Sequence, residues 1–265
     1  MKLTQSLVRL IEKLGYEIGR DSISNSLVIR RPLRLGRDFI ADCRVIHNGE
    51  LSCIFDVGAH MGETAHVFVN AFPEATIYSF EPTPSSFGRL SAFARRYPRV
   101  RTIHAALGDR DGDAPFFLNK YSQTNSLLPS ASGAQKFLVE PDQMDLQSTT
   151  TVPMLTLNRF CVERGIEKID LLKMDTQGAE LKVLAGAESF MRRSMIPLIY
   201  AEVCFEAYYA GQPLFQHVYE YLYECEYRLV GLYESGFRTH YYRVGGNALF
   251  VHQSIARRAI IAPIC

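Results

Sequence analysis

Short apolar runs separated by longer mixed segments recur along the chain from residue 52 onward. These runs predict seven strands: SCIFDV (52–57), ATIYSF (75–80), VRTIHAAL (100–107), IDLLKM (169–174), PLIYAEV (197–203), YRLVGLY (227–233) and NALFVHQ (247–253). The earlier runs are apolar throughout, which is typical of a parallel sheet with both faces covered. The intervening segments predict helices over 63–71, 85–97, 179–191 and 214–225. This alternation predicts an α/β fold of three layers with right-handed crossovers.

The first 50 residues follow a different pattern. Leu3, Leu7, Leu10, Ile11 and Leu14 recur at helical spacing ahead of Gly15. We therefore expect residues 1–50 to form an N-terminal helical extension or cap, and residues 51–265 to form the main domain. The helix packs on that domain, or alternatively makes a homodimer contact or covers an active site.

Residues 119–150 interrupt the alternation of strands and helices. The segment is rich in Ser, Thr, Gln, Asn and Pro, and it lies between two short predicted strands, 114–120 and 149–155. A long polar insertion in a compact domain is either disordered or a functional lid. Because it follows the third strand, a lid here would lie near the carboxyl edge of the sheet.

Composition narrows the class of protein. The chain has 265 residues, 47% of them hydrophobic, and a formal net charge of +1, which argues against a dedicated nucleic-acid binder. Six cysteines show no C-x-x-C pair, as expected for reduced thiols in a cytoplasmic protein. Arg9, Glu12 and Lys13 interrupt the N-terminal apolar residues, so no signal peptide is expected. No segment approaches the roughly 20 apolar residues that span a bilayer, and we expect a soluble protein without membrane insertion.

A sharp turn with two glycines, DVGAHMG (56–62), follows the first predicted strand. Gly58 lets the backbone turn tightly and lets a ligand approach, because it has no Cβ. Gly62 opens the next helix, whose N-terminal amides carry partial positive charge. The dinucleotide pattern G-x-G-x-x-G is not met, since His60 replaces its second glycine. Asp56 would oppose a phosphate, so the turn suits an ammonium group or a cationic ligand better.

Two more carboxylates follow the second and third strands. Glu81 ends the second strand, where a carboxylate can accept hydrogen bonds from both hydroxyls of a ribose. Asp109 follows the third strand and could accept from an adenine amino group. One acid at a strand end is often only a helix cap. Three in order match the amino-acid end, ribose and adenine of S-adenosylmethionine, which has a sulfonium and no phosphate, and they predict that cofactor.

The sequence also resembles the FkbM-type methyltransferases, which use S-adenosylmethionine and mainly methylate hydroxyl oxygens. The resemblance rests on IFDVGAHMGETA, YSFEPTPSSF, AALGD, IDLLKMDTQGAELKVLAGA and NALFV, and it covers about three quarters of the chain. It implies a Rossmann-like methyltransferase fold with seven strands, mostly parallel, and a reversed last strand. Two positions depart from the family's pattern: His60 stands where Asn is common, and Gln177 where Glu is common.

Residue roles follow from this resemblance. Asp56 and Gly58 would lie against the methionine part of the cofactor, Glu81 against the ribose, and Asp109 near the adenine. The full set of expected cofactor contacts is Asp56, Gly58, His60, Gly62, Thr64, Glu81, Pro82, Gly108 and Asp109. Lys173 and Asp175 would lie at the tip of the fourth strand, close to the transferable methyl group.

The chemistry of methylation assigns roles to these two residues. A hydroxyl acceptor loses its proton as the new bond forms, so a base within hydrogen-bond reach is expected, and Asp175 is the first candidate. Lys173 could orient Asp175 or stabilise a developing alkoxide; alternatively, a contact between Lys173 and Asp175 only fixes the loop. Glu202 could approach Asp175, and two carboxylates can bind Mg²⁺, so a divalent metal is a minor alternative, although no third ligand is evident.

The sequence thus predicts an O-methyltransferase acting on a sugar, a glycan or a secondary metabolite. The alternatives are methylation at nitrogen and an interaction module that binds S-adenosylmethionine without catalysis. A nicotinamide oxidoreductase is a more distant alternative, which the turn at Gly58 opposes. The aromatic residues Tyr208, Tyr209, Tyr241 and Tyr242, together with His240, lie in predicted loops where they could face a substrate or simply pack at the surface.

Overall fold

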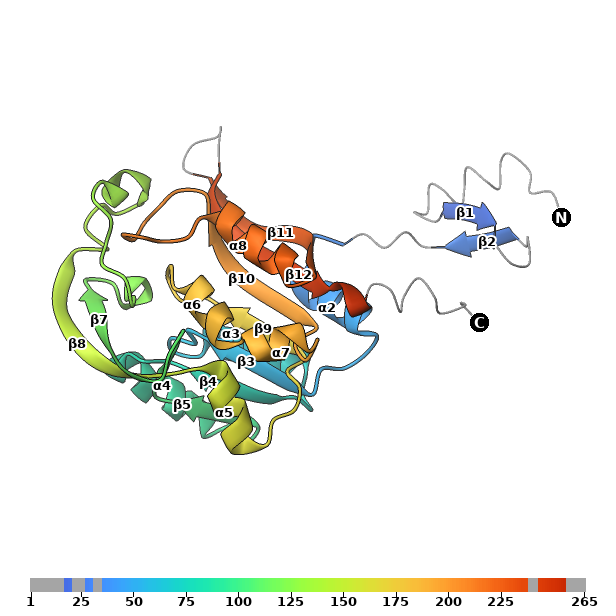
Figure 1. Cartoon of the computed structure of the whole chain (residues 1–265), viewed down its shortest axis with the longest axis horizontal. Helices are drawn as coiled ribbons and strands as arrows, with labels where there is room; N and C mark the ends of the chain where they lie inside the picture. The colour runs from blue at the N-terminus through green and yellow to red at the C-terminus, as the bar shows by residue number, and fades with distance from the viewer. Residues whose placement is uncertain (1–16, 21–26, 31–34, 238–242, 256–265) are drawn as a thin grey trace.

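A computed structural model of the chain describes residues 17–20, 27–30, 35–237 and 243–255. Its main sheet is built from β3 (Cys53–Val57), β4 (Thr76–Phe80), β5 (Val100–Ile103), β9 (Leu171–Met174), β10 (Leu198–Cys204), β11 (Tyr227–Phe237) and β12 (Arg243–His252). The strand order is β11-β12-β10-β9-β3-β4-β5 (Figure 1). Only β12 runs antiparallel to its two neighbours, because the other adjacent pairs are parallel. The predicted seven-stranded sheet with a reversed last strand is confirmed.

Helices cover both faces of this sheet (Figure 1). One face carries α2 (Phe39–His47), α3 (Glu63–Ala71) and α4 (Pro84–Ala94), and the other carries α5 (Leu157–Arg164), α6 (Glu180–Gly186), α7 (Glu188–Arg192) and α8 (Phe215–Glu224). Two separate apolar clusters hold the layers together, one centred on Phe68 and Ile77 and the other on Phe55 and Phe160. Burial on both faces explains why the strands read as continuous apolar runs, and the three-layer prediction is confirmed.

Two predicted elements are divided in the structure. The run VRTIHAAL is not one strand: β5 ends at Ile103, and β6 (Ala106–Leu107) joins a separate three-stranded sheet with β7 (Gly112–Asn119) and β8 (Leu146–Leu155). Polar residues recur along this run, at Arg101, Thr102 and His104, so His104 does not stand out as the position of the break. The helix predicted over 179–191 is likewise divided into α6 and α7, because Gly186 meets the carbonyl of Gly108 and the chain turns at Ala187.

Two helices, α2 and α5, were not among the predicted helical ranges. α5 is defined mainly by its ends. The Thr156 hydroxyl caps its first turn by accepting from the Arg159 N–H, and Gly165 ends it in a left-handed conformation.

The segment from 119 to 150 folds against the carboxyl edge of the main sheet. It contains two short 3-10 turns, η1 (Ser122–Thr124) and η2 (Ala134–Phe137), and it extends β7 and β8 at its two ends (Figure 1). Its side chains bond across to the main domain: the Ser126 hydroxyl donates to the Gln177 carbonyl at 2.7 Å. The segment therefore covers the carboxyl edge of the main sheet, where the sequence placed a possible lid.

The N-terminal part contributes one strand pair and one helix. β1 (Glu17–Arg20) and β2 (Leu27–Arg30) pair antiparallel, and α2 packs on the main sheet, where the Phe39 ring stacks on Tyr200 with 4.2 Å between centroids. The helix predicted over 3–14 lies outside the described residues. Among the residues that are described, no helix is long and apolar enough to cross a membrane, and five cysteines are free thiols.

Candidate active site

A cavity of about 310 Å³ opens where the strand order of the sheet reverses. From β3 the chain proceeds outward through β4 to β5, and it later returns to place β9 on the other side of β3. Such a switch point is the usual ligand site of an open α/β sheet, at the carboxyl ends of the strands. We call this space the switch-point cavity; the loops after β3, β4 and β9 and the insertion line it.

Gly58 is the tightest point of this cavity. Its backbone lies in the left-handed region with φ +73°, and a Cβ added there would lie 1.8 Å from the carbonyl oxygen of Asp175. The N–H groups of Gly58 and Ala59 both donate to the Phe80 carbonyl at 3.0 Å. The tips of β3, β4 and β9 therefore meet at a position that only glycine can occupy.

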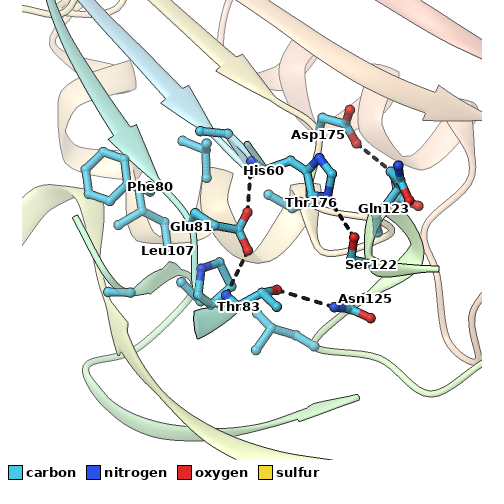
Figure 2. A pocket seen from close by; sticks show the side chains of 18 of the residues that line it. His60, Phe80, Glu81, Thr83, Leu107, Ser122, Gln123, Asn125, Asp175 and Thr176 are labelled. Carbon is cyan, nitrogen blue, oxygen red and sulfur yellow. Dashed lines mark hydrogen bonds between the residues drawn. The ribbon is translucent and has the colours of Figure 1, made fainter. Parts of the chain in front are cut away.

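Glu81 presents a carboxylate held by the backbone around it (Figure 2). One oxygen accepts from the His60 N–H at 2.9 Å, and the other accepts from the Thr83 N–H at 2.7 Å. The side chain is 5% exposed. Burial raises the pKa of Glu81, and these hydrogen bonds offset the rise only in part. The Thr83 side chain also bonds this carboxylate, and the lone pairs that remain can accept from a ligand.

His60 joins the glycine turn to the insertion. Its φ is +47°, a conformation that His and Asn adopt more readily than most residues. Its ring lies 2.9 Å through Nε2 from the Ser122 hydroxyl and 3.1 Å through Nδ1 from Glu63 (Figure 2). His60 therefore links the glycine turn to the insertion through its ring and to Glu81 through its backbone N–H.

Lys173 contacts Asp56 and not Asp175. Its ammonium lies 3.0 Å from the Asp56 carboxylate and donates to the Gly58 carbonyl at 3.1 Å. Burial lowers the pKa of Lys173, but the charges of Asp56 and Asp175 outweigh it and the pKa ends above its ordinary value. Lys173 is thus a charged group, and its contacts fix the glycine turn.

Gln177 bridges the two carboxylates at the tips of β9 and β10. Its side-chain NH₂ donates to Asp175 at 2.7 Å and to Glu202 at 2.9 Å, while its oxygen accepts from the Tyr209 hydroxyl at 2.8 Å. Its backbone is left-handed, with φ +54°. Burial, followed by the charges of Asp175 and Glu180, raises the pKa of Glu202 well above its usual range.

A second cavity, of about 440 Å³, lies beyond Gln177. We call it the tyrosine cavity, because Tyr208 and Tyr209 line it, together with Glu202 from β10, Asn247 from β12 and part of the insertion. Gln177 lines both cavities. His240, Tyr241 and Tyr242 lie outside the described residues.

The expected site residues divide into two groups. Those that line the switch-point cavity are Gly58, His60, Thr64, Glu81, Pro82, Lys173 and Asp175. Four expected residues lie outside its lining. Asp56 pairs with Lys173, and Asp109 pairs with Lys182 at 3.0 Å. Gly62 packs on Phe93, and Gly108 packs on Met154. Gly108 and Asp109 directly follow β6, whose residues Ala106 and Leu107 are the last of this segment to line the cavity.

The sequence did not point to several residues that complete the cavity. The insertion supplies Ser122, Gln123, Asn125 and Leu127 to its lining, and the small sheet supplies Phe116. The polar composition of the insertion and its place after the third strand were the only signals for this wall. The bridging role of Gln177 had no signal, because it depends on two partners that come from different strands.

Carboxylates gather at this edge without forming a metal cluster. In the described part of the chain, no three His, Cys, Asp or Glu side chains form a group that could hold a metal ion. The amide of Gln177 donates to both Asp175 and Glu202.

Comparisons with known proteins show the family to which this chain is similar. The family described as the methyltransferase FkbM domain matches residues 56–229. The 2-O-methyltransferase NoeI of Sinorhizobium fredii is 30% identical over 162 residues, which are 60% of this chain and 66% of NoeI. The 31-O-demethyl-FK506 methyltransferase FkbM of Streptomyces tacrolimicus is 30% identical over 177 residues, 58% of this chain and 68% of that protein. The hexuronic acid methyltransferase AglP of Haloferax volcanii is 25% identical over 134 residues, 50% of this chain and 48% of AglP.

Proposed function

Because the chain belongs to the FkbM methyltransferase family and is an S-adenosylmethionine-dependent methyltransferase, we propose that it methylates a hydroxyl oxygen of a sugar, a glycan or a secondary metabolite. The names of two relatives, a 2-O-methyltransferase and a 31-O-demethyl-FK506 methyltransferase, support oxygen as the acceptor atom. The alignments span about two thirds of the length of these relatives. The observation that carries the proposal is the Asp175 carboxylate, which lines the cavity beside the glycine turn.

The residues of the switch-point cavity fit S-adenosylmethionine. The Glu81 carboxylate suits the hydroxyls of a ribose, and the apolar side chains of Phe80, Leu107 and Phe116 suit a flat adenine ring. Asn125 also lines the cavity, and its amide donates to the Thr83 hydroxyl at 3.4 Å. Glu63, Glu81 and Asp175 favour a cationic ligand, and the one lining lysine, Lys173, is paired with Asp56.

Asp175 is positioned to take the proton of the acceptor. Its carboxylate accepts from the Gln177 amide and also shares a hydrogen bond with the Glu202 carboxyl. Its remaining lone pairs can accept from a hydroxyl in the cavity. When bound, the cofactor supplies an activated methyl group and leaves as a neutral thioether. The chain aligns donor and acceptor and excludes water, which can account for much of the rate. Lys173 holds the Gly58 carbonyl and therefore acts as a positioning residue.

Transfer of a labelled methyl group to a panel of glycosides, polyketide alcohols and amines tests this proposal. We expect incorporation into a hydroxyl compound, and we expect Asp175→Asn to lower turnover about 100-fold or more. The matched control is Asp109→Asn, an exposed carboxylate outside the cavity, which should retain turnover. Methylation of an amine that survives Asp175→Asn would favour nitrogen instead, because a neutral amine needs no base. Cofactor binding without transfer to any compound would favour a non-catalytic module.

A further inference from the structure

The tyrosine cavity is separate from the switch-point cavity to which we assign the cofactor. Three separate segments converge on it: the insertion through Phe137 and Met144, the loop after β10 through Tyr208 and Gln212, and β12 through Asn247. Its volume, about 440 Å³, falls in the range of roughly 300–1,000 Å³ that is typical of small-molecule sites.

The loop that carries the two tyrosines is held in place. The side-chain oxygen of Gln212 accepts from the N–H groups of Tyr208 and Tyr209, at 2.7 and 3.1 Å. The Tyr209 hydroxyl bonds the Gln177 side chain and the Thr124 carbonyl, at 2.8 and 2.9 Å. The aromatic wall is therefore fixed before any ligand arrives, which lowers the entropy lost on binding.

Gln177 is the junction of the two cavities. Its single NH₂ group donates to Asp175, which lines the switch-point cavity, and to Glu202, which lines the tyrosine cavity. An acceptor that occupies the tyrosine cavity would therefore meet the switch-point cavity at Gln177, next to the proton-accepting group proposed above.

The lining of the tyrosine cavity has a distinct chemistry. It combines aromatic rings with the amides of Gln143, Gln177, Gln212 and Asn247, and its one carboxyl group is that of Glu202. Among the described residues that line it, there is no Lys, Arg or His. Aromatic faces beside amides and a carboxylate suit a ring that carries hydroxyl groups. An anionic ring would be unfavourable here, because burial and the charges of Asp175 and Glu180 already oppose a negative charge at the Glu202 position.

We propose that the tyrosine cavity binds the methyl acceptor, and that it selects an uncharged polyhydroxylated ring over an anionic one. This inference rests on the proposed methyltransferase function, and it adds the place and the charge class of the acceptor. Glu202 accepts hydrogen bonds from the ring's hydroxyls, and Tyr208 contributes an aromatic face.

The test uses the protein saturated with S-adenosylhomocysteine. The probes are the methyl glycosides of glucose, galactose and mannose, each paired with its uronate, and binding is followed by ligand-observed NMR. We expect at least one uncharged glycoside to bind at least 10-fold more tightly than its uronate. Glu202→Gln should reduce that ratio at least 3-fold, and Tyr208→Ala should weaken binding of the uncharged glycoside at least 10-fold. Glu206→Gln, in the same loop but outside the lining, is the matched control.

Several outcomes overturn this inference while leaving the proposed function intact. They are the absence of glycoside binding to a protein that binds S-adenosylhomocysteine, a uronate that binds as tightly as its uncharged partner, and glycoside binding unaffected by Tyr208→Ala. Because the two variants change different walls of the cavity, the failure of one to fold leaves the other to decide. Loss of S-adenosylhomocysteine binding by the wild type would instead count against the proposed function.

Discussion

The pKa values of buried carboxylates are shifted in opposite directions at the two ends of the central strands. At the amino end, Asp170 precedes β9 and accepts from the N–H groups of Ser52 and Cys53, at 2.8 and 3.1 Å, with His47 also bonded and Lys168 paired. Burial alone would raise the pKa of Asp170, but these contacts hold it well below its usual range. At the carboxyl end, the pKa values of Glu81 and Glu202 are raised, with burial as the largest cause in each.

This difference separates structural acids from acids that await a ligand. The Asp170 carboxylate is already bonded to protein groups, so its ionised form stabilises the folded chain without a ligand. Glu81 and Glu202 each line a cavity. Burial disfavours their ionised forms, and hydrogen bonds donated by a ligand would stabilise those forms. Perturbed carboxylates in a cleft are typical of functional sites. We therefore infer that the carboxyl end of the sheet carries the functional site and that the amino end serves stability.

The largest effect is expected from the glycine at the carboxyl end. In Gly58→Ala the new methyl group would lie 1.8 Å from the Asp175 carbonyl, so the tips of β3 and β9 must separate. We expect a loss of about 3 kcal/mol in unfolding free energy, from the left-handed strain of about 1–2 kcal/mol plus the clash, and no detectable cofactor binding. Urea unfolding and calorimetry measure the two effects.

The control is Gly165→Ala at the end of α5, where φ is +63° and nothing lies within 4 Å of the added Cβ. It should cost only the backbone strain, about 1 kcal/mol, and leave binding unchanged. Equal losses of unfolding free energy in the two variants would show that the close approach of Gly58 to the Asp175 carbonyl adds nothing beyond backbone strain.

A smaller effect on stability is expected at the amino end. Asp170→Asn removes a charged acceptor of several hydrogen bonds and should lower the unfolding free energy by about 2 kcal/mol at pH 7. Because the folded-state pKa of Asp170 is depressed, its stabilisation is complete above the unfolded value of about 3.9 and is lost as the pH falls below it. Urea unfolding at pH 7 and pH 3 should show the difference between wild type and variant shrinking at the lower pH. A constant difference would contradict this role.

The smallest effect is expected from the titration of Glu202. Its folded-state pKa is raised above the unfolded value, so its contribution to stability is present at low pH and is lost as the pH rises past the unfolded value. Glu202→Gln removes that dependence. Between pH 5 and pH 8 the variant should therefore gain about 3 °C in thermal midpoint relative to wild type. A gap that does not change with pH would mean that Glu202 titrates normally.

Much of the fold could be read from the chain, because burial on both faces of a parallel sheet leaves apolar runs that need no tertiary information. Gly58 and Glu81 were found for the same reason: both follow such a run directly, and the carboxyl ends of parallel strands lie at one edge. Asp109 was expected in the cavity on that logic too. The chain leaves the main sheet four residues after the start of β5, and that departure has no mark in the apolar pattern.

The rest of the site depends on contacts that join distant segments. Ser122 reaches His60 across 62 positions, and Gln177 reaches Glu202 across 25. Neither spacing has a periodicity, so neither can be recognised along the chain. The polar insertion looked equally consistent with disorder and with a lid, because composition does not report the partners that its hydroxyls and amides find.

The most direct test of the central claim is calorimetric titration with S-adenosylhomocysteine of wild type, Glu81→Ala and Asp170→Asn. We predict micromolar binding by the wild type and a loss of about 100-fold or more in Glu81→Ala, because two hydrogen bonds to a charged group are removed. Asp170→Asn should bind within about twofold of wild type at a temperature where it remains folded. Wild-type protein that fails to bind, or Glu81→Ala that binds as tightly as wild type, would contradict the assignment of the switch-point cavity to the cofactor.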